Sequence, residues 1–277
     1  MKKLFCSQSF RVLIALALAV GAAKLAVAAE KKDARVTQVV KDVRVLVSKS
    51  GGRAATVNET IREGQAVRTG DESRAELTFT DQSLTRLGAN TVFSFGADAK
   101  EFELASGAAL ICVPKSSGAV RINTAAATAA VTGFTALAEY HPKGTYKFIV
   151  LEGDACIKTR NANPTEPCIQ LHSGDMLIVP HNGQADKKTV DVKKIINSSK
   201  LINGFKDKLP DYVTQEIGLA VAGQQNGEPP KGGYTDPTNQ NAVDQAHADN
   251  TPPEPKSTPH GSPPGDLRRH NAPRNRP

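Results

Sequence analysis

The sequence predicts an all-β fold, a single sandwich or coiled β-sheet domain, followed by a short helical extension and a disordered tail. Apolar residues recur at every second position in short runs between residues 43 and 179. Turn residues separate these runs every eight to twelve positions. Alternation of this kind indicates half-buried strands, and regularly spaced turns are typical of sandwiches and barrels. The alternation is lost after residue 182, so the β-domain is predicted to span residues 36–182.

Seven runs carry the alternation most clearly: Val43–Val47, Glu76–Phe79, Thr91–Phe95, Glu101–Leu104, Ala119–Asn123, Thr145–Leu151 and Met176–Val179. A loose internal echo joins three further segments, each with a glycine turn just before a strand: Arg62–Val67, Leu151–Cys156 and His172–Leu177. Successive rungs of a coiled sheet would produce this echo. Ordinary hairpin turns would produce it as well, so both interpretations remain open.

Residues 191–222 change from the period of a strand to that of a helix. Their apolar positions fall roughly on one helical stripe, which is broken near Ser198-Ser199 and Gly204. Pro210 can begin a second short helix and Gly223 can end it. A stripe this narrow is expected to cover the core of the β-domain, and docking to a partner is the alternative.

Residues 1–28 have the pattern of a signal peptide. Lys2, Lys3 and Arg11 form a basic start, residues 12–23 are apolar, and residues 26–28 form an Ala-Val-Ala cleavage site. An uncleaved anchor is the rival interpretation, but a membrane span needs about 20 predominantly apolar residues. We therefore expect a bacterial protein exported to the periplasm or secreted, with no transmembrane segment after signal cleavage.

Residues 224–277 are predicted to be disordered. Eleven of the 17 prolines lie there, among glycine, asparagine and other small polar residues. Such a segment cannot bury enough apolar surface to offset the entropy lost on ordering.

The charge balance argues against binding to nucleic acid. The formal net charge of the chain is +7, but residues 1–28 contribute four basic and no acidic residues. The remaining 31 basic and 28 acidic residues nearly balance, unlike the strongly basic surface of a nucleic-acid-binding domain. Tryptophan is absent, which also disfavours stacking platforms for single strands.

Three cysteines remain after signal removal, and three pairings are possible. Cys156 and Cys168 are centred on the turn-like segment 160–164, so a symmetric hairpin would place them directly opposite each other. We predict a disulfide between them, worth about 3 kcal/mol in the chain-entropy model. Cys112, which lies among apolar neighbours, is then a buried free thiol.

No motif supports catalysis or a resident cofactor. The sequence contains no nucleophile elbow, P-loop, dinucleotide fingerprint or paired metal-ligand spacing. We therefore predict no catalytic, cofactor-binding or metal-ligating residues. A partial match to the second motif of the cupins, metal-binding β-barrels, around residues 174–183 leaves one alternative open. This is a cupin-like metal-dependent enzyme that uses His172 or His181.

The run from Val67 to Thr91 resembles the core of the FecR domain, a bacterial extracytoplasmic β-domain. It contains Val67-Arg68-Thr69-Gly70, Ser73-Arg74-Ala75, Asp81-Gln82-Ser83 and Leu87-Gly88-Ala89-Asn90-Thr91 in the order and spacing of that family. The resemblance extends over roughly residues 40–180 and implies a binding and regulatory module. The sequence departs from the family at Gly133, where the usual Arg-Gly-Thr-x-Phe element reads Thr-Gly-Phe-Thr-Ala.

These observations predict a non-catalytic binding or scaffolding module of the cell envelope. Its partner would be an envelope protein or a cell-wall polymer, recognised through strand edges or one sheet face of residues 36–222 rather than through the tail. The alternatives are the cupin-like enzyme and an accessory component of extracytoplasmic signalling that acts through another membrane protein.

Overall fold

A computed structural model describes residues 33–47, 52–96, 101–181 and 184–225. The predicted signal peptide, and the predicted tail beyond Gln225, lie outside these described residues. Among the described residues, no helix is long and apolar enough to cross a membrane.

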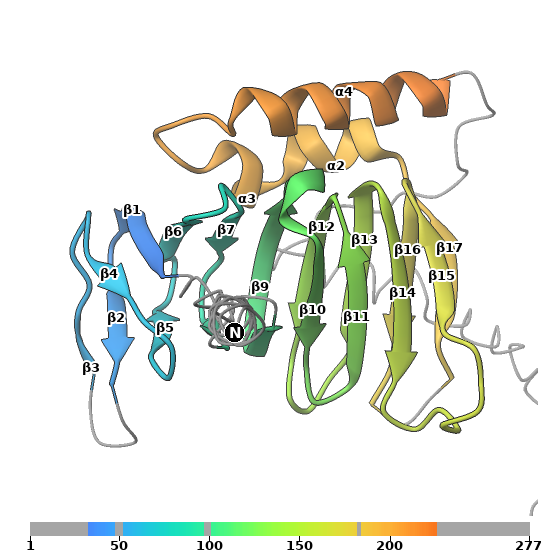
Figure 1. Cartoon of the computed structure of the whole chain (residues 1–277), viewed down its shortest axis with the longest axis horizontal. Coiled ribbons are helices and arrows are strands. Elements are labelled where there is room, and N and C mark those ends of the chain that lie inside the picture. The colour runs from blue at the N-terminus through green and yellow to red at the C-terminus, as the bar shows by residue number, and fades with distance from the viewer. Residues whose placement is uncertain (1–32, 48–51, 97–100, 182–183, 226–277) are drawn as a thin grey trace, which may run out of the picture.

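Within the described part of the chain, seventeen strands form one hydrogen-bonded array that folds into two stacked sheets (Figure 1). The first, sheet A, contains in spatial order β4 (Thr60–Ile61), β1 (Ala34–Val40), β6 (Arg74–Phe79), β7 (Leu84–Leu87), β9 (Glu101–Val113), β12 (Phe134–Tyr140), β13 (Tyr146–Glu152), β16 (Asp175–Val179) and β17 (Asp186–Thr189). The second, sheet B, contains β3 (Gly52–Ala54), β2 (Val43–Leu46), β5 (Ala66–Thr69), β8 (Val92–Phe95), β9, β10 (Ala119–Asn123), β11 (Ala127–Thr132), β14 (Asp154–Thr159) and β15 (Ile169–His172). The fold is therefore an all-β sandwich, as the sequence predicts.

Strand β9 belongs to both sheets. Its first part pairs with β8 and β10 in sheet B, and the part from Gly107 onward pairs with β7 and β12 in sheet A. The pairing of β9 with β10 is parallel, whereas the other strand pairs of the described residues are antiparallel. Gly107 stands at the transition with φ +89°. This conformation is readily available to glycine because it has no Cβ.

At each point where the chain passes from one sheet to the other, a residue has positive φ. These residues are Lys41, Asn58, Gly64, Glu72, Asn90, Gly107, Gly118, Gly133, Gly153 and Gly174, whereas Gln82, also with positive φ, lies in the β6–β7 hairpin of sheet A. These crossings explain the three similar segments of the sequence, because Gly64, Gly153 and Gly174 are the glycines of those segments. Each leads the chain across the sandwich into the next strand.

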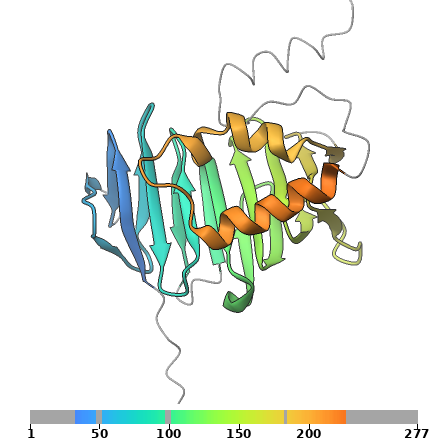
Figure 2. The ribbon, with the colours of Figure 1, turned by 90° about the horizontal axis from the view of Figure 1, so that it is seen from above.

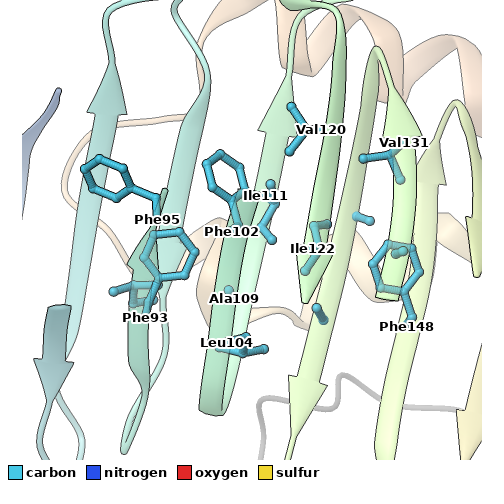
Figure 3. Close-up of a cluster of buried hydrophobic side chains, with 14 of the residues drawn as sticks. Phe93, Phe95, Phe102, Leu104, Ala109, Ile111, Val120, Ile122, Val131 and Phe148 are labelled. Atoms are coloured by element: carbon cyan, nitrogen blue, oxygen red, sulfur yellow. The ribbon is translucent and has the colours of Figure 1, made fainter. Parts of the chain in front are cut away.

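The main core lies between the sheets. Side chains at alternate positions of both sheets meet there, and Figure 3 shows Phe93, Phe102 and Phe148 among the aliphatic residues of this cluster. Aromatic rings concentrate around Phe102, whose centroid is 5.1 Å from that of Phe79 and 5.5 Å from that of Phe93. The period-two pattern therefore encodes one buried face for each sheet.

Three helices and one helical turn complete the described part of the chain. A 3₁₀ turn, η1 (Lys115–Ser117), follows β9, and the C-terminal part contains α2 (Val192–Ser198), α3 (Lys200–Asn203) and α4 (Asp211–Gln225). Asp191 caps α2 by accepting from the backbone N–H of Lys194, and Ser199 caps α3. The predicted breaks near Ser198-Ser199 and Gly204 are thus the boundaries of α2 and α3. We name residues 190–225 the helical cap.

The strands extend beyond the predicted bounds of the β-domain. They begin at Ala34 and end at Thr189, against the predicted 36–182, and the helices run over 192–225, against 191–222. Strand β17 lies beyond the predicted bound because Asp-Lys-Lys-Thr is polar and exposed throughout, so the sequence shows no alternation there. Charged residues of this kind protect the edge of a sheet from pairing with other chains.

Candidate functional site

The helical cap covers the outer face of sheet A, as Figures 1 and 2 show. A second apolar cluster lies between them, with Leu110, Leu137 and Ile149 from the sheet and Ile195 and Ile217 from the cap. The helical stripe in the sequence is therefore buried against the β-domain. This face of the sandwich is occupied by the protein's own chain.

A buried arginine fastens the cap to the sheet. Arg86 of β7 is fully buried, and its Nε donates to Oε2 of Glu76 on β6 at 2.7 Å. Its other N–H groups donate to backbone carbonyls of the cap, those of Leu201 (3.3 Å), Ile202 (2.9 Å) and Asp207 (2.7 Å). The ring of Phe205 stacks over the guanidinium, with 4.4 Å from the carbon to the ring centroid. One planar cation thus pairs with an acid and with three carbonyls of the cap.

Further polar contacts tie the same segment to the sheet. Nε of Arg74 donates to the carbonyl of Gly204 at 3.0 Å. Oε1 of Gln38 accepts from the backbone N–H groups of Lys206 and Asp207. The hydroxyl of Tyr212 donates to the carbonyl of Gln82 at 2.8 Å. The cap is therefore an integral layer of the fold.

The outer face of sheet B has no such cover within the described residues, and in Figure 1 no helix lies over β10, β11 and β14. On these three strands the outward side chains are small or polar, with Arg121, Ala130, Thr132 and Asp154 among the exposed ones. An exposed ion pair joins Arg121 to Glu101 at 3.3 Å. Of the two broad sheet faces, this is the one that no described helix covers.

Charges on this face are unevenly arranged. Arg44 and Arg68 stand directly opposite each other on β2 and β5, an arrangement of like charges that is unfavourable in a sheet. Nε of Arg44 also donates to Oδ1 of Asp42 at 3.1 Å. Partial burial raises the pKa of Glu103 on β9 above its usual range. The face therefore offers both signs of charge on a rigid surface.

The residues that carry the FecR resemblance serve the fold. Oγ1 of Thr69 donates to the carbonyl of Gly88 at 2.5 Å and accepts from the backbone N–H of Thr91 at 2.9 Å. Oγ1 of Thr91 in turn accepts from the N–H of Ala108 at 3.0 Å. Together with Arg74 and Arg86, these residues join strands and cap. They form no surface site.

The glycine retained at position 133 has a steric reason. Gly133 has φ +55° in the turn between β11 and β12. A Cβ at this position would lie 2.9 Å from the Cα of Lys115 in η1, which is closer than real Cβ contacts. The missing threonine of the family element leaves this packing unchanged, since the constraint concerns the glycine alone.

The structure contains a disulfide between Cys156 and Cys168, with a Cα–Cα distance of 5.5 Å. The hairpin register differs from the symmetric one that the sequence predicts. Cys156 stands opposite Gln170 rather than opposite Cys168, because the hairpin is centred on Asn163 and its register is shifted by two residues. The bridge therefore crosses the hairpin diagonally, on the outer side of sheet B.

Replacing both bridged cysteines with serine should lower the free energy of unfolding by about 3 kcal/mol. Without the bridge, the loop between the two residues, which are 12 positions apart, no longer restricts the unfolded chain. Urea unfolding followed by far-ultraviolet circular dichroism measures the change. The Cys112→Ser variant tests a different effect, the burial of a hydroxyl in the second apolar cluster. Equal stability of the oxidised parent and the double variant would contradict this prediction.

Cys112 is a buried free thiol, and burial raises its pKa to about 12. The two histidines of the cupin-like alternative do not share a site. His172 is exposed on β15, where its Nδ1 lies 2.6 Å from Oδ1 of Asp154. His181 lines a pocket between the hairpin turns at the end of the sandwich. The described residues contain no group of three or more His, Cys, Asp or Glu side chains that could hold a metal ion.

A family model described as FecR protein matches residues 65–156. This segment is therefore similar to the FecR family, and the resemblance in the sequence is confirmed over a narrower range than 40–180. The match runs from β5 to β14 and includes β9.

Two solved structures of a candidate anti-sigma factor from Parabacteroides distasonis ATCC 8503, at 1.65 and 2.50 Å resolution, are similar to this chain. Each is 18% identical with a TM-score of 0.41, and the alignment covers 47% of this chain and 61% of the other. The chain thus spans less than two thirds of that protein's solved length. No curated protein matches.

Proposed function

We propose that this protein is a non-catalytic binding or scaffolding module of the bacterial cell envelope, which recognises a protein or a cell-wall component outside the cytoplasm. One observation chiefly supports the proposal. Sheet A is covered by the helical cap, whereas the outer face of sheet B has no cover among the described residues. A rigid sheet face binds at a small cost in ordering.

The FecR match supports a signalling or regulatory module of this type. The disulfide fits an oxidising compartment, and the export pattern of residues 1–28 points the same way. The second candidate function is an accessory role in extracytoplasmic signalling through another membrane protein, which the family match favours equally.

The binding site is expected on the outer face of sheet B, around Arg121 and Ala130, which are neighbours across β10 and β11. Both side chains are exposed, so changing them leaves the core intact. Arg121→Glu reverses a charge and Ala130→Arg adds bulk. Lys193→Glu reverses an exposed charge on α2 and is the matched control on the opposite side.

Full-length protein and these variants should be compared by pull-down from envelope extracts and by sedimentation with purified cell wall. We expect a partner of the parent protein to be lost with Arg121→Glu and Ala130→Arg, and kept with Lys193→Glu and with a chain ending at Gln225. Loss of the partner on removal of residues 226–277 alone would assign binding to the tail and overturn the proposal. Metal analysis of the purified protein distinguishes the binding module from the cupin-like enzyme. The enzyme requires a stoichiometric metal, which would be lost with His172→Ala or His181→Ala.

A further inference from the structure

A pocket of about 760 Å³ opens at the end of the sandwich where four hairpin turns meet. These turns join β10 to β11, β12 to β13, β14 to β15 and β16 to β17. The wall combines side chains next to both sheets, including Ala126, Tyr140, Pro142, Thr159, Arg160 and Val179. Its volume lies within the range of about 300–1,000 Å³ typical of sites for small molecules.

Tyrosine hydroxyls at this end of the core lack partners. Tyr140 lines the pocket and is 8% exposed, and its hydroxyl has no hydrogen bond to another described residue. Tyr146 stands directly opposite it in the β12–β13 pair and is fully buried, with a hydroxyl that also has no partner. A buried hydroxyl without a partner, such as that of Tyr146, is unfavourable. Tyr140 is the tyrosine that lines the pocket, so a polar ligand there can form a hydrogen bond with its hydroxyl.

Opposite charges flank the mouth of the pocket. Arg160 and Glu166 both line it and both are exposed. Nη1 of Arg160 donates to the carbonyl of Ala125 at 3.1 Å, which leaves further N–H groups of the guanidinium available. Neither Arg160 nor Glu166 forms an ion pair with another described residue. The mouth can therefore take one anionic and one cationic group of the same ligand.

The hairpin that bears these two charges is held in place. The disulfide between Cys156 and Cys168 closes its base. Nζ of Lys158 donates to the carbonyl of Pro164 at 2.7 Å, and the backbone N–H of Glu166 donates to the carbonyl of Asn163 at 2.9 Å. A loop fixed in this way loses little entropy when a ligand binds.

We infer that this pocket binds a short peptide with free termini. The peptide carboxylate pairs with Arg160, its ammonium group pairs with Glu166, and its backbone lies against Tyr140 and the apolar wall. The pocket is larger than a single amino acid needs, which favours a peptide of a few residues. This site goes beyond the proposed function, because it lies at the end of the sandwich and not on the outer face of sheet B.

Isothermal titration calorimetry of the full chain with trialanine tests the inference, using peptides capped at the N-terminus, the C-terminus or both. Each cap should weaken binding at least about tenfold, because it removes one charged contact. Arg160→Gln should abolish the discrimination against the C-terminal amide. Glu166→Gln should abolish the discrimination against the N-acetyl cap. Tyr140→Phe should weaken binding of all the peptides while keeping both discriminations.

Arg121→Gln and Glu101→Gln, which alter the exposed ion pair on sheet B, are the matched controls and should leave trialanine binding unchanged. Absence of binding to trialanine by a folded parent protein would overturn the inference, as would equal binding of free and doubly capped peptide. Because the pocket variants and the sheet-face variants share no residue, failure here is distinguishable from failure of the proposed partner surface.

Discussion

Replacing Arg86 with methionine should lower the free energy of unfolding by about 3–5 kcal/mol, the usual effect of breaking a buried ion pair. The variant leaves the carboxylate of Glu76 7% exposed with its cation gone, although Oγ1 of Thr37 still donates to Oε1 at 2.7 Å. It also leaves the carbonyls of Ile202 and Asp207 without their donor. Urea unfolding followed by circular dichroism measures the loss.

The double variant Arg86→Met with Glu76→Met is the informative control. It removes both charges, so it should be more stable than Arg86→Met alone even though it contains one more substitution. Arg86→Lys keeps the charge but loses the planar set of donors, so an intermediate loss is expected. Ordinary surface substitutions change stability by up to about 0.5 kcal/mol. If Arg86→Met stays within that range of the parent, the contacts of Arg86 with Glu76 and the cap contribute little.

Replacing Gly107 with alanine should lower the free energy of unfolding by about 3 kcal/mol or more, from backbone strain and steric overlap together. The backbone has φ +89° there, and a Cβ would lie 2.5 Å from the Cα and 2.7 Å from the Cβ of Thr91. Thr91 cannot easily move, because its Oγ1 bonds to both the N–H and the carbonyl of Ala108.

Gly64→Ala is the matched control for this change. Gly64 has a similar φ of +77°, but nothing lies within 4 Å of the position of its missing Cβ. Its substitution should therefore cost only the strain of the left-handed backbone, about 1–2 kcal/mol. If urea unfolding shows the same loss in the free energy of unfolding for both variants, the close approach of Thr91 to β9 does not contribute to the loss.

The sequence predicts those parts of the fold that local patterns encode. Val43–Val47 and Met176–Val179 read as strands because alternation is visible within a few residues. Strand β17 shows no alternation because both of its faces meet solvent. The disulfide was accessible from spacing, but the register was not, since the turn between β14 and β15 is asymmetric.

The candidate site depends on contacts that no local pattern reveals. Arg86 lies in the run that resembles the FecR core but outside its four motifs, and its carbonyl partners in the cap follow more than 110 residues later. The position of the cap decides which sheet face stays uncovered. The sequence does not encode that position locally, so it does not predict which of the two faces is available. His181 stood out as a possible ligand, whereas Arg160 and Glu166, on the mouth of the same pocket, had no motif to mark them.

The double membership of β9 has a consequence for how the chain folds. Among the described residues, strands β1 to β8 pair with one another and with β9, and strands β10 to β17 pair with one another and with β9, without a pair between the two groups. Each half can therefore gather its own hairpins as it is synthesised, with short chain closures and little entropic penalty. The cap comes last in the chain and contacts both halves, Arg74 and Arg86 on one side and β13 on the other. We expect the cap to dock last and to join the two halves, which form locally, into one cooperative folding unit.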